Sequence, residues 1–524
     1  MVPDEPEGFC LYDTTLRDGA QQEGIQLSVA DKLRIVDLLD GFGIPFIEGG
    51  WPGSNAKDTQ FFEAMAGKRL HQAKMVAFGA TRKAGSSAAK DPLLQALVDA
   101  RTEWVCLVAK SHPGHVKHAL KTSLDENLAM VADSVTWLIE HDLRVIIDAE
   151  HYFEGFLEDS TYAREVAKTA AEAGASWVVL CDTNGGMLPA QISDIVSRTL
   201  SVGAHVGIHC HNDSGCALAN SLAAVDAGAL MVQGTINGYG ERTGNLDLVP
   251  LIGDLHLKYG WHLLTAEQLT SMTHVSNAVA DITGQPRQPR QPYVGVSAFA
   301  HKAGLHASAL KVDQSLYQHI EPESVGNRMR MLISDASGRA NVEIKARELG
   351  LDLSGDGVVA SVVAAVKQRE SVGYSYEAAD ASFELLSLDA AGALVKPFEV
   401  SRWRVLTDDA NVAEATVTLR VGGERLVRVG EGNGPVDALG DGLRQGLAAS
   451  FPDVAGYELV DYRVRILDTG HGTDATVRVL IDTTDGGDRR WTTVGVGTNV
   501  IEASWEALSD AYLYGLVKGY GAAQ

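Results

Sequence analysis

The residues best suited to chemistry are two histidines one residue apart, in a His-Cys-His-Asn-Asp sequence that begins at His209. They follow an apolar run at 204–208, which is typical of the end of a buried β-strand. Side chains at positions i and i+2 of a strand point the same way, with Cα atoms roughly 6.6 Å apart. Both imidazoles can therefore reach one cation, whereas the alternation turns Cys210 away from it. Two structural histidines at a strand end are the alternative interpretation.

A carboxylate that could complete such a site lies near the start of the chain, where a short apolar run ends in a polar turn. Arg17 and Asp18 stand side by side in this turn. Two imidazoles and one carboxylate, with the remaining positions open, are suitable ligands for a divalent cation that also holds a chelating substrate. An arginine beside the metal-binding aspartate supplies donors for an organic anion. Because Arg-Asp-Gly alone is a common turn, its significance depends on the two histidines.

The composition indicates a soluble, multidomain, intracellular protein. A chain of 524 residues exceeds what one core usually supports, so two or three domains are expected. No stretch approaches the ~18–20 apolar residues of a membrane span, and the acidic start is unlike a signal peptide. The five cysteines are scattered, which favours reduced thiols in a cytoplasm over a disulfide framework.

The formal net charge of −24 disfavours nucleic acid and anionic membranes as partners. If the substrates are anions, local cations have to capture them against this overall field. The candidates in the first half of the chain are Arg17, Arg82, Lys110 and Arg242.

Short apolar runs alternate with amphipathic helical patterns through residues 9–260, and Ser28 is a candidate N-cap for the first helix. The strand candidates are 9–13, 45–48, 74–78, 104–108, 144–148, 177–181, 205–209 and 230–236. Eight strand-helix units in about 250 residues predict an α/β fold of the (β/α)8 TIM-barrel type. An open, doubly wound sheet is the alternative.

In a TIM barrel the chemistry sits at the carboxyl ends of the strands. Polar residues follow the predicted strand ends repeatedly, and together they would converge on one face of the barrel. These residues are Asp18, Glu48, Glu150, Thr183, His209, His211 and Asn245.

The pattern changes after the barrel. Proline occupies every third position of 286–292, which predicts an extended linker, and a largely helical region follows to about residue 395. We therefore expect a catalytic barrel at 1–275, linker subdomains at 276–395 and a third domain at 396–524.

The last segment contains a weak internal repeat. Glycine pairs at Gly430 and Gly432 and at Gly495 and Gly497 each follow a strand candidate and precede a helix candidate, with an offset of 65 residues (495 − 430). Two such units predict an α+β domain with internal twofold similarity. The turns at Gly432 and Gly497 open onto helix N-termini, where a carboxylate could bind, although plain turn geometry explains them equally well.

Three motifs together resemble one enzyme family. They are Asp-Thr-Thr-Leu-Arg-Asp-Gly at 13–19, His-Cys-His-Asn-Asp at 209–213 and Gly-Tyr-Gly-Glu-Arg-Thr-Gly-Asn at 238–245. This set resembles the metal-dependent family of isopropylmalate, homocitrate and citramalate synthases and related lyases. The resemblance covers nearly the whole chain, and the stretch at 46–55, with Trp51, is most similar to the long bacterial citramalate-forming branch.

The resemblance implies a set of site residues. Metal ligands would be Asp18, His209, His211 and, as a fourth, Asn245, holding Mg²⁺ or Mn²⁺ with Zn²⁺ or Co²⁺ as alternatives. Substrate-binding residues would be Arg17 beside the oxo oxygen, Thr183 at the carboxylate, and Glu48. Catalytic residues would be Arg17, Glu150, and His306 and Tyr317, the last two entering the active site of a partner subunit in a homodimer.

The resemblance also implies the reaction. Acetyl-CoA would condense with pyruvate to give citramalate on a route to isoleucine, and isoleucine would be the feedback inhibitor bound at 396–524. An isopropylmalate synthase acting on 2-oxoisovalerate is the nearest alternative. A retro-aldol lyase and an amino-acid sensor with a vestigial barrel are further alternatives; the complete set of metal ligands speaks against the sensor.

Overall fold

The computed structural model describes residues 4–409, 412–467 and 475–520. These residues form two compact units. The first runs to Phe299 and takes in Ile320–Arg328, and the second consists of Ala300–His319 and the chain from Met329 onward. The division into three domains expected from the sequence stays a prediction.

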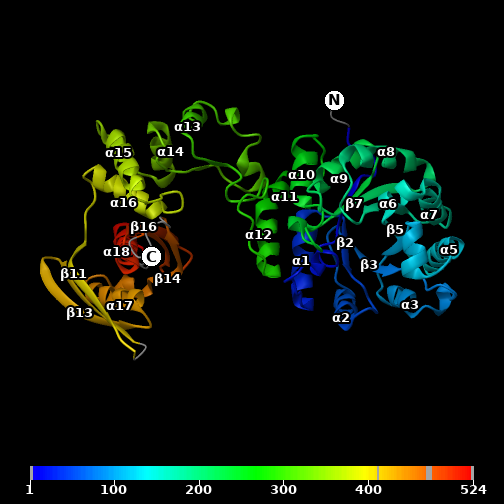
Figure 1. Cartoon of the computed structure of the whole chain (residues 1–524), viewed down its shortest axis with the longest axis horizontal. Helices are drawn as coiled ribbons and strands as arrows, with labels where there is room; N and C mark the ends of the chain where they lie inside the picture. The colour runs from blue at the N-terminus through cyan, green and yellow to red at the C-terminus, as the bar shows by residue number, and fades with distance from the viewer. Residues whose placement is uncertain (1–3, 410–411, 468–474, 521–524) are drawn as a thin grey trace. The chain divides into compact units, whose positions relative to one another are not determined.

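Eight parallel strands close into a barrel in the first unit, each paired with its neighbours in chain order and β8 paired with β1 (Figure 1). The strands are β1 (Cys10–Asp13), β2 (Phe46–Gly50), β3 (Lys74–Ala80), β4 (Trp104–Lys110), β5 (Arg144–Glu150), β6 (Trp177–Asp182), β7 (His205–Cys210) and β8 (Met231–Gly234). Every predicted strand is present, and each of its ends lies within two residues of the predicted one. The predicted TIM barrel is therefore confirmed, and closure excludes the open doubly wound sheet.

Helices surround the barrel and cover its outer apolar face. They are α1 (Val29–Phe42), α2 (Ala56–Met65), α3 (Pro92–Asp99), α4 (Pro113–His115), α5 (Leu124–Glu140), α6 (Tyr152–Glu158), α7 (Ser160–Glu172), α8 (Pro189–Thr199), α9 (Ala217–Asp226), α10 (Leu248–Leu257), α11 (Ala266–Thr270) and α12 (Met272–Thr283). The first begins as predicted, because Ser28 Oγ accepts a hydrogen bond from the Asp31 N–H and the Asp31 carboxylate accepts one from the Ser28 N–H.

The barrel interior is packed rather than open. Tyr12, Phe46, Val76, Phe78 and Ile146 are among the inward-facing side chains of one buried apolar cluster. None of the helices among the described residues combines the length and apolarity needed to cross a bilayer. All five cysteines carry free thiols, as the sequence predicts.

The proline-rich segment at 285–292 contains no helix or strand, as predicted, but the prediction of an extended linker is wrong. The chain turns there, since the Gln291 N–H donates to the Gln288 carbonyl and the Ser297 N–H donates to the Pro289 carbonyl. The Gln291 side chain donates to Asn237 and Asp247 of the barrel unit, which holds the segment against it. Tertiary hydrogen bonds thus override the local preference for an extended chain.

The second unit begins with a largely helical part, as predicted. Its elements are β9 (Ala300–His301), α13 (Gly304–Leu310), β10 (Arg330–Met331), α14 (Arg339–Leu349), α15 (Val358–Ser371) and α16 (Asp380–Ala390).

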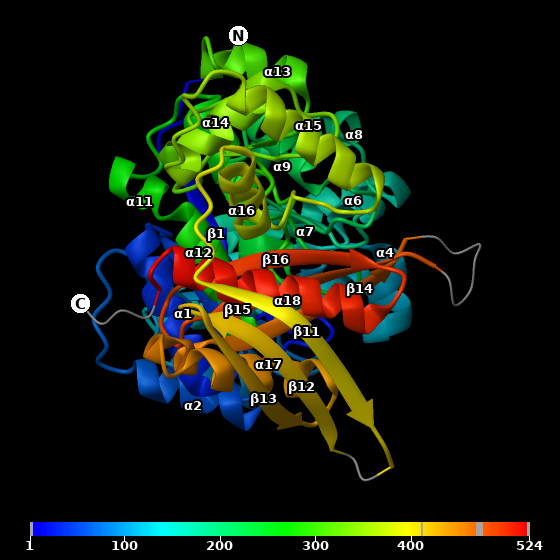
Figure 2. The ribbon, with the colours of Figure 1, turned by 90° about the vertical axis from the view of Figure 1, so that its left-hand side faces the viewer.

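Two strand-strand-strand-helix repeats follow, and in each one the helix packs on its three-stranded antiparallel sheet (Figure 2). The first repeat is β11 (Phe398–Thr407), β12 (Ala413–Val421), β13 (Glu424–Gly432) and α17 (Pro435–Leu447), and the second is β14 (Glu458–Ile466), β15 (Val477–Thr484), β16 (Arg490–Gly497) and α18 (Val500–Val517). The predicted internal repeat is confirmed.

The repeated glycines allow strand and helix to approach closely. A Cβ on Gly430 would lie 2.2 Å from the backbone nitrogen of Gly442, and one on Gly495 would lie 2.0 Å from the Ala503 carbonyl oxygen. The turn at Gly432 is already filled by a carboxylate of the chain itself, because Asp437 Oδ2 accepts a hydrogen bond from the Asn433 N–H. The hypothesis that this turn binds a ligand carboxylate is therefore wrong.

Candidate active site

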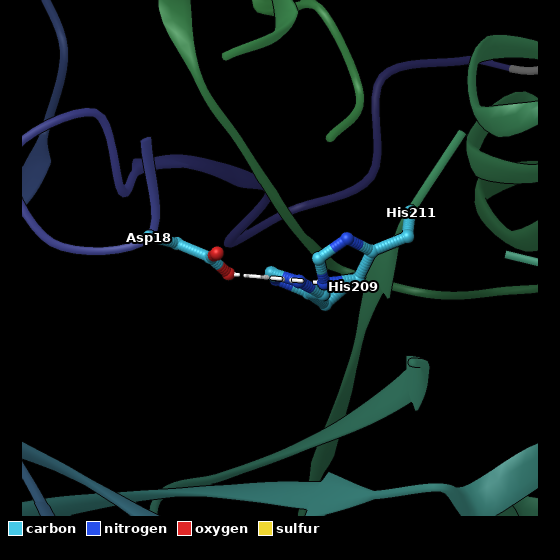
Figure 3. Close-up of side chains that lie close together, drawn as sticks. All are labelled: Asp18, His209 and His211. Atoms are coloured by element: carbon cyan, nitrogen blue, oxygen red, sulfur yellow. Dashed lines mark ion pairs between the residues drawn. The ribbon is translucent and has the colours of Figure 1, made fainter. Parts of the chain in front are cut away.

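Three buried side chains meet at the carboxyl end of the barrel. The Asp18 carboxylate points toward the imidazoles of His209, at the end of β7, and His211, just beyond it (Figure 3). Asp18 Oδ2 lies 3.4 Å from His209 Nε2 and 3.9 Å from His211 Nε2. Ligand atoms about 2.1 Å from one cation are separated by roughly 3–3.5 Å, so a small closure of this group would hold a divalent ion. The structure thus brings together the three residues that the sequence singled out.

A fourth ligand position is available beside these three. Asn245 pairs with His211 through a β-bridge, and its Nδ2 donates to the Tyr239 carbonyl at 3.0 Å. Its Oδ1 is buried and has no hydrogen-bond partner among the described residues. Because a buried carbonyl oxygen without a donor is costly, a cation or a water bound to it would relieve that cost. The donor set therefore fits a divalent metal ion.

The ionisation of the three residues suits metal binding. Burial lowers the pKa of His209 to about 4, although the Asp18 carboxylate opposes the shift, and burial lowers the pKa of His211 as well. Burial alone would raise the pKa of Asp18, but Arg17 and the two imidazoles hold it below its usual value. At neutral pH the imidazoles are therefore uncharged and the carboxylate is ionised, which are the forms that bind metals.

The loop that carries Arg17 and Asp18 is anchored to the neighbouring strand β8. The Asp13 carboxylate accepts hydrogen bonds from the Thr15 N–H and hydroxyl at 2.9 and 2.8 Å. Thr15 Oγ1 in turn accepts from the Ile236 N–H at 2.9 Å, and the Thr14 N–H donates to the Gly234 carbonyl. This explains the Asp-Thr-Thr sequence, because these side chains fix the turn that presents the ligand.

Two side chains hold Arg17 in place, the Glu48 carboxylate and the Phe78 ring. Its Nε donates to Glu48 at 2.5 Å, and Glu48 also accepts from the Tyr12 hydroxyl at 2.6 Å. Its guanidinium carbon lies 3.9 Å from the centre of the Phe78 ring, against which Trp51 packs edge-on. Trp51, whose role the sequence left open, thus supports the ring that carries Arg17. Both Glu48 oxygens accept hydrogen bonds, one from Arg17 and one from Tyr12, so Glu48 orients Arg17, and its predicted contact with substrate stays a prediction.

Thr183 and Glu150 end two adjacent strands of the same barrel mouth. Thr183 Oγ1 accepts a hydrogen bond from the His151 N–H at 2.8 Å, which leaves the hydroxyl hydrogen to donate to an anion. Glu150 forms an ion pair with Lys110 on the neighbouring strand β4. Lys110 is therefore neutralised rather than free for an anionic substrate.

The other cations predicted to capture anions are also paired. Arg82 is buried and donates to Glu126 and Asp133 of α5, and Arg242 makes two hydrogen bonds to Asp213. Both arginines hold neighbouring segments together through these pairs, and their capture of an anionic substrate stays a prediction. Each partner lies 29 to 51 residues away in sequence, where local patterns carry no signal.

A second group of potential ligands lies in the barrel interior, where Glu48, Cys106 and Asp148 approach one another. Burial raises the pKa of the Cys106 thiol well above its ordinary value, so the sulfur keeps its proton. Glu48 is satisfied by Tyr12 and Arg17, and Asp148 accepts from Gln233. This group therefore already has its hydrogen-bond partners, and it supports the site above it.

His306 and Tyr317 belong to the second unit. Their rings stack with centres 4.1 Å apart, so the structure brings these two predicted residues together. Tyr317 is exposed, which leaves the pair accessible.

Comparison with known proteins places this geometry in a family. Models described as HMGL-like, homocitrate synthase post-HMGL domain-like and LeuA allosteric (dimerisation) domain match residues 9–279, 293–373 and 377–516. An (R)-citramalate synthase of Streptomyces coelicolor is 56% identical, covering 98% of this chain and 97% of that protein. The chain belongs to the isopropylmalate, homocitrate and citramalate synthase family.

Synthases of this family differ in how similar their sequences are to this chain. An (R)-citramalate synthase of Synechocystis is 48% identical, with 97% of this chain and 96% of that protein covered. A 2-isopropylmalate synthase of Methanocaldococcus jannaschii is 30% identical, with 96% of this chain and 94% of that protein covered. The similarity therefore favours the citramalate-forming branch, as expected from the stretch around Trp51. Enzymes of this family depend on a divalent metal, in agreement with the buried ligand group.

We expect His209→Ala and Asp18→Ala to lose turnover by about 10³-fold, because a Lewis-acidic cation contributes several kcal/mol to the transition state. Metal content and steady-state rate should be measured on folded protein. His141→Ala, at an exposed histidine at the end of α5, is the matched control and should keep its rate. A site variant that retained more than a tenth of the activity with metal bound would show that the ligands are misassigned.

Proposed function

We propose that the protein condenses acetyl-CoA with pyruvate and hydrolyses the thioester, which yields (R)-citramalate and CoA. One observation carries this proposal. Arg17 and the metal-ligand group share one barrel mouth, in a chain that is 56% identical to an (R)-citramalate synthase over nearly its whole length. Mg²⁺ or Mn²⁺ is the proposed ion, since the site offers imidazole, carboxylate and amide ligands and no thiolate.

The residues of the barrel have distinct proposed roles toward the oxo acid. A divalent cation held by Asp18, His209, His211 and Asn245 would supply Lewis-acid polarisation of the pyruvate carbonyl. Arg17 donates to the carbonyl oxygen, where negative charge develops, and the Phe78 ring keeps the guanidinium in place. The Thr183 hydroxyl donates to the pyruvate carboxylate. Preorganised donors of this kind cost no reorganisation when the bond forms.

The proposed base is His306, which takes a proton from the methyl group of acetyl-CoA. The methyl carbon, which keeps the electron pair of the broken C–H bond, attacks the pyruvate carbonyl carbon. Arg17 stabilises the negative charge that develops on the carbonyl oxygen of pyruvate. Water then cleaves the thioester and releases CoA, which makes the condensation irreversible. Tyr317 and Glu150 are proposed to orient the acetyl-CoA thioester and the water.

Free thiols and an acetyl-CoA substrate support a cytoplasmic location.

A homodimer is proposed because β14 exposes a row of apolar side chains. Leu459, Val460, Tyr462, Val464 and Ile466 are each 37–56% exposed. Such a strand face is unfavourable in water and suits burial against a second copy. In the dimer, His306 and Tyr317 would enter the active site of the other subunit.

An amino-acid effector is proposed for the two repeats, and isoleucine is the candidate as the end product that citramalate feeds. A cavity of about 490 Å³ lies between α17, β14 and α18. Its lining includes Arg444, which forms an ion pair with Asp441, and it includes Leu459 and Leu508, which offer apolar contacts. This mixture suits a zwitterion with a branched apolar side chain, and the family model matched to 377–516 is that of an allosteric domain.

The substrate assignment predicts that kcat/KM is higher for pyruvate than for 2-oxoisovalerate or 2-oxoglutarate in a thiol-release assay with acetyl-CoA. Each extra methyl group in such a pocket changes the barrier by only ~1–3 kcal/mol, so 2-oxobutyrate should show appreciable activity. A matched assay with chelated metal should show no release. Greater efficiency with 2-oxoisovalerate or 2-oxoglutarate would overturn the assignment.

The proposed exchange of His306 between subunits predicts complementation. His306→Ala and His209→Ala should each be inactive alone, and mixed heterodimers should regain about a quarter to a half of the wild-type rate because one intact site forms. Each variant mixed with itself is the control. Heterodimers verified by tagged purification that remain inactive would place His306 in its own subunit's site, or outside catalysis.

The effector proposal predicts that millimolar isoleucine slows the full-length enzyme, with a coupling of ~1–3 kcal/mol or about 5–150-fold. Arg444→Gln should raise the inhibitory concentration roughly 10- to 100-fold, because it removes a charged hydrogen bond. Arg402→Gln, at an exposed arginine of β11, is the matched control and should respond like the wild type. The idea fails if neither isoleucine nor leucine alters the rate or the melting temperature.

A further inference from the structure

A buried hydrogen-bonded chain leads from one metal ligand into the barrel interior. His209 has two ring nitrogens with different surroundings, and Nε2 is the one that lies near Asp18. Nδ1 lies 2.9 Å from Oε1 of Gln233, its register partner on β8. The amide of Gln233 also reaches across the barrel, where Nε2 donates to Asp148 Oδ1 of β5 at 2.9 Å. His209 and Asp148 are each 4% exposed and Gln233 is fully buried, so water does not compete for these bonds.

The bond to Asp148 orients the Gln233 amide. Its NH₂ group faces Asp148 Oδ1, which accepts the hydrogen bond at 2.9 Å. The amide oxygen then faces His209, and the two nitrogens of that ring are no longer equivalent. Since Oε1 can only accept, His209 carries its hydrogen on Nδ1, and the lone pair of Nε2 points toward Asp18. The reversed amide would place its oxygen against the Asp148 carboxylate and its NH₂ against the ring.

His211 provides an internal contrast. Its Nδ1 is buried but has no hydrogen-bond partner among the described residues. The protein therefore orients one imidazole of the pair through a dedicated side chain and leaves the other without such a partner. The His-Cys-His sequence gives no sign of this difference between the two rings. It appears only in the folded structure, where Gln233 lies beside His209.

We propose that Gln233, held by Asp148, is a positioning residue that fixes the tautomer and ring plane of His209 for the catalytic cation. This inference rests on the proposed function, because it requires the metal site assigned there. Partners of this kind behind metal-ligating histidines usually change metal affinity or activity 10- to 100-fold when removed. Gln233 itself touches neither substrate nor cation.

The test is Co²⁺ binding to the full-length protein, followed by visible absorption and by calorimetric titration. Gln233→Leu and Gln233→Met each remove the acceptor and should weaken Co²⁺ binding roughly 10- to 100-fold and change the absorption bands. The double variant Gln233→Glu with Asp148→Asn exchanges amide and carboxylate. It keeps an acceptor for His209 and a donor from position 148 to position 233, so it should bind Co²⁺ within about threefold of wild type.

The outcomes separate this inference from the metal site itself. Wild-type protein should bind Co²⁺ and His209→Ala should not; if the wild type binds none, the metal site and this inference both fail. If the wild type binds Co²⁺ and the two single variants bind it equally well with unchanged bands, Gln233 has no positioning role. Lower melting temperatures in the single variants with unchanged Co²⁺ affinity would likewise overturn the proposal, because they mark a structural role. The two single variants give independent readings where one of them fails to fold.

Discussion

Two neutral imidazoles and one carboxylate share a buried space at the mouth of the barrel, and the rest of the first unit serves to keep them there. Removing these groups from water costs free energy that their mutual contacts at 3.4–3.9 Å do not recover. A divalent cation among them converts that cost into ligand bonds. The closely packed barrel around these groups keeps them in the positions in which they can bind a cation.

Three sets of contacts around these side chains keep them in position. The Asp-Thr-Thr turn is tied to β8, Arg17 lies between Glu48 and the Phe78 ring, and Gln233 connects His209 to Asp148. Among the described residues, several buried polar atoms around the barrel mouth lack a hydrogen-bond partner. They include Asn245 Oδ1 and His211 Nδ1 beside Asp18, and also Trp51 Nε1 and His151 Nδ1.

The strands and the ligand residues could be predicted from the sequence because their signals are local. Apolar runs separated by helical periodicity located all eight strands, and the rule for barrel strand ends located Asp18, His209 and His211. Features that depend on pairing between distant segments could not be predicted. Arg82 seemed available for anions, although Glu126 and Asp133 neutralise it.

Two further features had only a weak signal in the sequence. Gln233 is a polar residue in a buried, otherwise apolar strand, and its inward position becomes visible only when β8 is placed beside β7 and across from β5. The turn at Gly432 looked like a carboxylate site, but a residue five positions later fills it, because Asp437 folds back onto the turn. Proline periodicity at 286–292 was likewise overridden by hydrogen bonds from Gln291 to the barrel unit. In each case a tertiary contact decided between local alternatives.

The most direct measurement of the central claim is a crystal structure of the protein with Mn²⁺ and pyruvate, using the anomalous signal of the metal. The account predicts one peak within about 2.5 Å of Asp18 and the Nε2 atoms of His209 and His211, with pyruvate chelating the ion and its carbonyl oxygen facing Arg17. A peak elsewhere, a peak ligated by only one of the three residues, or a bound pyruvate that does not contact the ion would contradict it.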